Sequence, residues 1–129
     1  MNTQMDSYNS SLSENRLVGW LVSYGLDDLG VAYEIRTGRS FISNKQSSQA
    51  RMLAVVDSSI SSPHLALKAS ARNKVMVQDI FSDHGSFITR ADNNREYPIT
   101  GPTEIKHGDW VRVGQNVRFQ VCIIDGSGR

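Results

Sequence analysis

The feature that most constrains the fold is a two-residue alternation of apolar and polar side chains. Apolar residues occupy alternate positions within 31–35, 111–113 and 119–123. This is the period of a half-buried β-strand, because successive strand side chains point to opposite faces. Further short apolar runs occur at 16–24, 52–56, 65–69 and 74–78. No long helical stripe is present, so the sequence predicts an all-β chain: a two-sheet β-sandwich of mostly antiparallel short strands.

The 129 residues suit a single domain, and 39% hydrophobic with 21% charged residues is typical of a folded chain. Residues 1–15 are mostly polar, so we expect a flexible N-terminal tail there. The folded domain is expected over 16–125. Residues 126–129 have the composition of a linker or an expression remnant.

Several function classes are disfavoured by composition. The formal charge is only +1, whereas broad nucleic-acid binding needs a basic surplus. No apolar run approaches the ~18 residues of a membrane span, and the first residues do not resemble a secretory signal. Together with the single cysteine, Cys122, these features predict a cytoplasmic protein that binds neither membrane nor nucleic acid.

Catalytic and metal-binding signatures are not found. His64, His84 and His107 lie far apart without the paired spacing of metal ligands. The sequence also has no Gly-x-Ser-x-Gly elbow and no phosphate loop ending in Lys-Ser or Lys-Thr. We therefore expect no enzyme activity, no metal and no cofactor.

Three short segments, each weak alone, follow one another at intervals of about twenty residues. They are Gly38-Arg39-Ser40, Ser59-Ile-Ser-Ser-Pro-His64 and Asp79-Ile-Phe-Ser-Asp-His-Gly-Ser86, and Gly108-Asp109 precedes a later apolar strand. Between the first two we expect a long polar loop over 39–51, of the kind that often carries function. The ordered set resembles the forkhead-associated (FHA) domain, a β-sandwich that binds phosphothreonine peptides.

The resemblance implies a division of roles among these residues. Arg39 and Ser61 would contact the phosphate, since guanidinium and hydroxyl groups are suitable donors to a dianion. The phosphopeptide-binding set is Arg39, Ser40, Ser61, Ser62, Asp83 and His84. The structural set is Gly38, His64, Gly85, Gly108 and Asp109. In the family, the residue matching His64 ties neighbouring loops together through hydrogen bonds.

Three substitutions depart from the family pattern. His84 stands where Asn is common, Asp83 where a small polar residue is frequent, and Ser62 where a basic residue is frequent. A carboxylate directed into the site would repel phosphate. Residues 35–78, however, carry seven cations against Asp57 alone, a net +6, while the remainder carries −5. This asymmetry would attract an anion if Arg39, Lys45 and Arg51 lay near the site.

The sequence therefore predicts a phosphothreonine-dependent recognition module in Ser/Thr kinase signalling. Its partner would be a phosphothreonine-containing protein or peptide, such as a kinase or a kinase substrate. The alternative is a degenerate FHA domain that acts as a phospho-independent scaffold or self-association module. Asp83, His84 and Ser62 motivate that alternative.

Overall fold

The computed structural model describes residues 15–126. The predicted tail over 1–15 therefore falls almost wholly outside the described residues, as do 127–129 of the predicted linker. Residues 15–126 form eleven strands in two mostly antiparallel sheets with almost no helix, which confirms the predicted all-β class. Within this part of the chain, no helix is long and apolar enough to cross a membrane.

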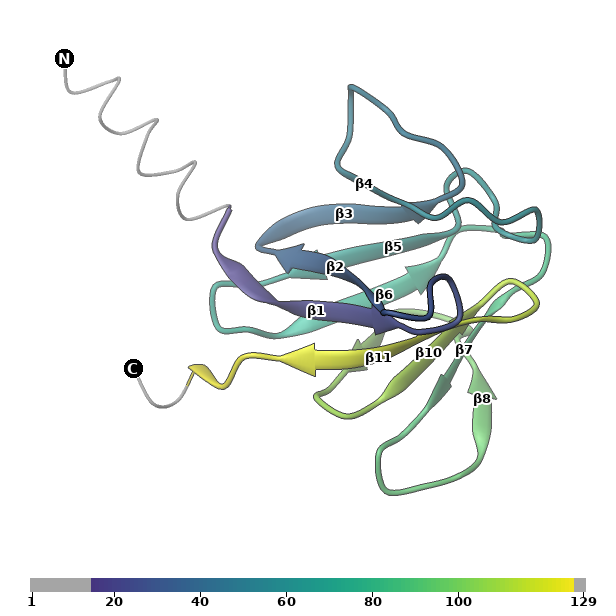
Figure 1. Ribbon diagram of the computed structural model, residues 1–129. Helices are drawn as coiled ribbons and strands as arrows, with labels where there is room; N and C mark the ends of the chain where they lie inside the picture. Colours follow the sequence, from purple (N-terminus) through teal and green to yellow (C-terminus); the bar gives the residue numbers. More distant parts are fainter. Residues whose placement is uncertain (1–14, 127–129) are drawn as a thin grey trace, which may run out of the picture.

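The two sheets face each other (Figure 1). In spatial order, the six-stranded sheet contains β2 (Val31–Arg36), β1 (Leu17–Ser23), β11 (Val117–Ile123), β10 (Trp110–Val113), β7 (Ser86–Thr89) and β8 (Glu96–Pro98). The five-stranded sheet contains β4 (Met52–Ala54), β3 (Gly38–Ser43), β5 (Leu65–Ala69), β6 (Val75–Asp79) and β9 (Thr103–Ile105). The β3–β4 pair is parallel, and the other strand pairs among the described residues are antiparallel.

The core follows from the alternation in the sequence. In β5, Leu65 and Leu67 are buried between the sheets while Lys68 is exposed on the outer face. From the opposite sheet, Phe119 is fully buried and meets the ring of Tyr33 edge-on at 5.8 Å between centroids. Burying each such side chain contributes about 1.5–3 kcal/mol, so this packing fixes the register of the strands.

The structure corrects the expected loop over 39–51, because its first part is strand β3. Gly38 has φ 95°, a left-handed conformation that turns the chain from β2 directly into β3. Ser40 and Ile42 then point inward and are buried, while Arg39 is exposed. Of the two inward side chains, Ser40 is polar and Ile42 is apolar. The apolar alternation that identifies a strand is therefore missing from this part of the sequence.

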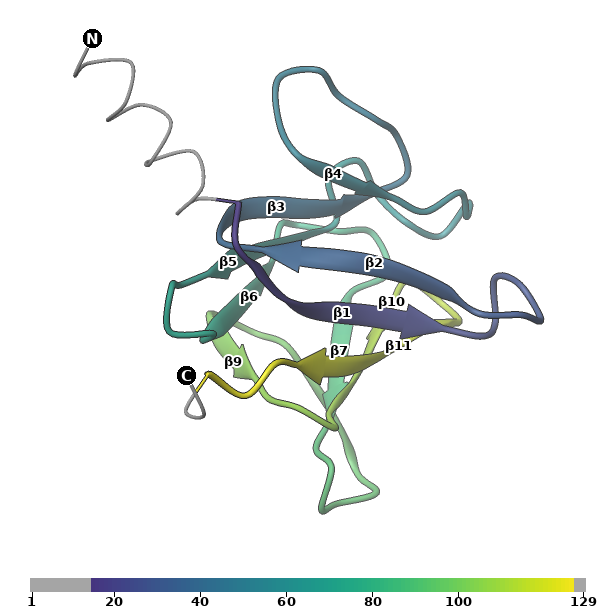
Figure 2. The same ribbon diagram turned by 60° about the vertical axis from the view of Figure 1, so that its left-hand side comes forward.

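Several connections meet at one end of the sandwich, which we call the apical loops: residues 43–45, 56–62, 80–85 and 114–115. Figure 1 shows them toward the right-hand side, and Figure 2 shows the same end from another direction. Hydrogen bonds join them: Asn44 N–H donates to Ser61 O at 3.3 Å, and Gln115 N–H donates to Ser59 Oγ at 3.0 Å. The turn of residues 70–73, between β5 and β6, lies at the opposite, basal end.

Candidate functional site

Ser61 lies at the junction of three apical loops and is half-buried. Its Oγ accepts a hydrogen bond from the Asp83 amide at 3.1 Å, and its carbonyl accepts one from the Asn44 amide at 3.3 Å. A hydroxyl that accepts from an amide keeps its own proton for another acceptor. Ser61 therefore presents a positioned O–H donor at the molecular surface.

His64 holds this arrangement from beneath and is 0% exposed. Its Nδ1 accepts from the Ser61 amide at 2.9 Å, so the ring proton sits on Nε2, which donates to Gly85 O at 2.8 Å. One buried imidazole thus connects the loop that carries Ser61 to the turn that carries Gly85. Gly85 itself has φ 83°, a conformation that strains residues with a side chain.

Asp79, at the end of β6, organises the next loop. Its carboxylate accepts from the Ser82 amide at 3.0 Å, from Ser82 Oγ at 2.6 Å and from Ser86 Oγ at 2.5 Å. Partial burial raises the pKa of Asp79, but these hydrogen bonds and the nearby His64 more than offset that effect, so the pKa lies below its ordinary value. The loop between β6 and β7 therefore has a fixed shape at neutral pH.

The apical loops carry fewer cations than the sequence predicted, since Arg39, Lys45 and Arg51 were all expected near the site. Lys45 is the one Lys or Arg among the residues of these loops, and its side chain is exposed. Two carboxylates, Asp57 and Asp83, accompany it. Asp57 accepts from the hydroxyl and the amide of Ser59, and these bonds lower its pKa. Asp83 is exposed, so its carboxylate can turn toward water.

Arg39 and Ser40 are not brought together with Ser61. Arg39 pairs with Lys68 across β3 and β5, whereas Ile42 pairs with Leu65 nearer the apical end. Three residues of strand separate these positions, which is about 10 Å. Ser40 is buried between the sheets, and its hydroxyl has no hydrogen-bond partner there.

The remaining predicted binding residues do lie in the apical loops. Ser62 follows Ser61 and is exposed, and His84 follows Asp83 and is exposed. Arg51 does not join them. It lines a pocket of about 460 Å³ together with Arg39 and Gly38, toward the basal end of β3. The basic stretch of the sequence is thus divided along the sandwich rather than gathered around Ser61.

Gly108 and Asp109 form a tight turn before β10. Asp109 is buried, and its carboxylate accepts from the amides of Ala91 and Lys106 and from Arg90 Nη1 at 2.8 Å. These bonds fix the turn to the β7–β8 connection. The position of both residues agrees with a structural function away from the apical loops.

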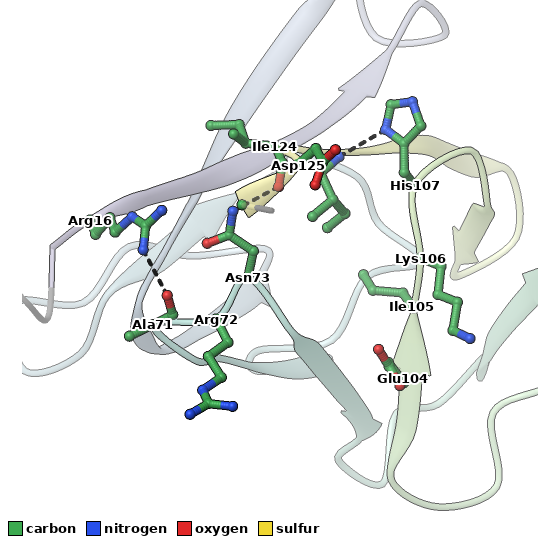
Figure 3. A pocket seen from close by; sticks show the side chains of 12 residues that line it. Arg16, Ala71, Arg72, Asn73, Glu104, Ile105, Lys106, His107, Ile124 and Asp125 are labelled. Atoms are coloured by element: carbon green, nitrogen blue, oxygen red, sulfur yellow. Dashed lines mark hydrogen bonds between the residues drawn. The ribbon is translucent and has the colours of Figure 1, made fainter. Parts of the chain in front are cut away.

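A second hollow of about 800 Å³ lies at the basal end (Figure 3). Arg16 donates to Ala71 O at 2.7 Å there, and Asn73 Nδ2 donates to Ile124 O at 2.7 Å. None of the residues predicted to bind phosphopeptide lines it. Over residues 15–126, no three His, Cys, Asp or Glu side chains gather in a way that could hold a metal.

Asn44 and Lys45 are apical residues that the sequence reading did not assign to the binding set. Asn44 contacts Ser61 through its backbone, and Lys45 follows it. The sequence signal for them was the apolar Ile42 in the middle of the polar stretch, which lies in the last part of strand β3, and that strand ends at Ser43.

Comparison with known proteins agrees with this architecture. The FHA domain family model matches residues 35–114. The FHA domain of human APLF, solved with an XRCC1 bisphospho peptide, has a TM-score of 0.67 at 15% identity, covering 83% of this chain and 99% of that one. The FhaA FHA domain, complexed with the intracellular domain of Rv3910, has a TM-score of 0.60 at 23% identity. The match covers 81% of this chain and 98% of that one.

A third similar structure was solved in a structural and functional analysis of phosphothreonine-dependent FHA domain interactions. It has a TM-score of 0.63 at 21% identity and covers 84% of this chain and 97% of that one. No curated protein matches the sequence. These structural likenesses show the fold, and the family match spans more than half of the chain. The chain therefore belongs to the FHA domain family.

Proposed function

We propose that this domain recognises phosphothreonine-containing proteins or peptides at its apical loops, as part of Ser/Thr kinase signalling and without catalysis. The observation that carries the proposal is the Ser61 hydroxyl, which the Asp83 amide holds at 3.1 Å while its own proton stays available. A phosphate brings about −1.5 to −2 charges and several acceptor oxygens, so a positioned O–H donor is a suitable first contact.

Two neighbours complete the proposed site. Lys45 supplies an ammonium group, and Asn44 supplies a side-chain amide on a backbone already bonded to Ser61. Ser62 and the imidazole of His84 can donate to the phosphate or to the peptide main chain. In this proposal Asp83 contributes through its backbone, and its exposed carboxylate faces water.

Arg39 was the expected phosphate ligand, but its pairing with Lys68 favours a different assignment. We assign the cationic contact to Lys45, which follows β3 at the apical end, rather than to Arg39, which lies near its beginning. A lysine ammonium is a compact charge without the bidentate geometry of arginine. We therefore expect a weaker phosphate contact than a guanidinium would give.

The alternative, a phospho-independent scaffold or self-association module, is favoured by a specific observation. The apical loops hold Lys45 as their single Lys or Arg against Asp57 and Asp83. A scaffold of that kind would bind its partner equally well with and without phosphate.

A matched pair of peptide libraries tests the proposal, one with phosphothreonine and one with threonine at the fixed position. We expect the domain to retain phosphorylated peptides selectively and to release them when phosphatase is added. Equal retention of the two libraries would favour the scaffold. Retention of neither by the folded domain would contradict phosphothreonine recognition.

A further inference from the structure

Phe81 combines two unfavourable features in the loop between β6 and β7. Its side chain is 101% exposed, so the whole ring is in contact with water. Its φ is 48°, in the left-handed region that bulky residues rarely adopt. A residue in such a conformation persists only when the surrounding structure determines it, and such residues cluster at ligand-binding sites.

The neighbours of Phe81 fix its backbone on both sides. Asp79 accepts hydrogen bonds from the amide and the hydroxyl of Ser82, and Ser82 Oγ in turn accepts from the Gly85 amide at 2.9 Å. Phe81 lies inside this closed set of bonds, and its side chain takes no part in them. The loop therefore has a defined shape that holds the ring outward, and a residue suited to left-handed backbone would keep that shape with less strain.

The position of the ring relates it directly to the candidate site. Phe81 is two residues from Asp83, whose amide contacts the hydroxyl of Ser61 at 3.1 Å. On the loop that carries Ser61, Val56 is also exposed, at 90%. Two apolar side chains thus project from the same two loops that form the proposed phosphate site.

The charges indicate what these side chains would contact. Asp57 and Asp83 lie on the same loops as Val56 and Phe81, so they disfavour acidic residues on either side of a bound phosphothreonine. An apolar residue carries no such penalty and would remove the phenyl ring from water. Aromatic side chains are effective anchors because they bury a large area at little cost in conformational entropy.

We propose that Phe81 is a specificity-determining contact for an aliphatic or aromatic side chain flanking the phosphothreonine of the bound peptide. This inference rests on the proposed function, because the peptide must first be held at Ser61. Phe81 acts through apolar contact alone and forms no bond to the phosphate. The peptide bound at the apical loops is therefore one with an apolar residue beside its phosphothreonine, rather than one with acidic residues there.

The test compares the wild-type domain with Phe81→Asn, since Asn tolerates left-handed backbone. A phosphothreonine library with one randomised flanking position at a time gives the sequence preference. Fluorescence polarisation of the selected peptides gives the affinity, and thermal unfolding gives the stability. The matched control is Leu29→Asn, because Leu29 is similarly exposed, at 91%, in the β1–β2 connection, which carries none of the proposed binding residues.

We expect Phe81→Asn to lose the preference for an apolar flanking residue. Its affinity for the selected peptides should fall about tenfold, which corresponds to the loss of roughly 55 Å² of apolar contact. Its unfolding temperature should stay equal or rise, and it should still prefer phosphorylated peptides. A purely structural residue would instead lower stability and affinity together. The control should match the wild type in affinity and preference.

Two outcomes would overturn the inference in different ways. If Phe81→Asn keeps the wild-type affinity and flanking preference while phosphate dependence persists, Phe81 is not the contact and the proposed function stands. If the wild-type domain shows no preference for phosphorylated peptides, the proposed function fails and this inference fails with it.

Discussion

The amide of Asp83 donates to the hydroxyl of Ser61 at 3.1 Å, across two loops that are 22 residues apart in the sequence. This bond joins the end of the five-stranded sheet to the turn that leads into β7. It also explains how an acidic residue can belong to a proposed phosphate site, since the contact uses the backbone of Asp83 and not its carboxylate.

Replacing Ser61 should weaken phosphopeptide binding strongly. In Ser61→Ala the phosphate loses a hydroxyl donor and the Asp83 amide loses its acceptor. A hydrogen bond to a charged group contributes about 1.5–3 kcal/mol, so the dissociation constant should rise about ten- to a hundredfold. Titration calorimetry measures this. Ser61→Thr keeps the hydroxyl and is the matched control, and equal affinity of the Ala and wild-type domains would exclude Ser61 as a ligand.

Arg39 and Lys45 should respond in opposite ways to substitution. Arg39→Ala removes a cation that lies directly opposite Lys68, so stability should be unchanged or rise by a few tenths of a kcal/mol, and phosphopeptide affinity should be unchanged. Lys45→Ala should weaken binding several-fold, most clearly at low salt. Polarisation titrations at two salt concentrations compare the pair. A larger loss of phosphopeptide affinity in Arg39→Ala than in Lys45→Ala would contradict this assignment and indicate that Arg39 contacts the phosphate.

His64→Ala should destabilise the domain by about 2–4 kcal/mol, because it leaves a cavity and removes the partners of Ser61 N–H and Gly85 O. Urea denaturation at neutral pH measures the loss. His84→Ala is the control, since His84 is exposed and should change stability by less than about 0.5 kcal/mol. Similar stabilities of the two variants would mean that the buried imidazole does not hold the loops.

Asp79 should make stability depend on pH in the acid range. Its pKa is lower in the folded chain than in the unfolded chain, where it is about 3.9. Its contribution is therefore complete above the unfolded value and is lost as pH falls through the lower folded value. Asp79→Asn should be less stable than the wild type at pH 7, and the difference should narrow as the pH is lowered below about 4. A constant difference between pH 7 and pH 3 would contradict this.

Much of the fold was predictable from the sequence, because a period of two identifies strands whose inner face is buried. Strand β3 was not predicted, because its inward positions hold Ser40 and Ile42. Only Ile42 of these two is apolar. Gly38 was expected to have a structural role, and its φ of 95° is the left-handed conformation of a turn residue.

The candidate site was predictable only in part. The resemblance to the FHA family singled out Ser61, His64 and Gly85, and the structure brings these three residues together. Arg39 was expected to contact the phosphate because the Gly38-Arg39 pair matches the family pattern. A match of two residues does not show which end of a strand they occupy. Phe81 could not be found, because neither full exposure nor a left-handed φ leaves a trace in one sequence.

The most direct measurement is a two-dimensional amide NMR titration of the labelled domain with a phosphothreonine peptide and its unphosphorylated twin. The phosphopeptide alone should shift the amides of Asn44, Lys45, Ser61 and Asp83 and leave those of Arg39 and Lys68 unchanged. Shifts centred on Arg39 and Lys68, or identical shifts with both peptides, would contradict phosphothreonine recognition at the apical loops.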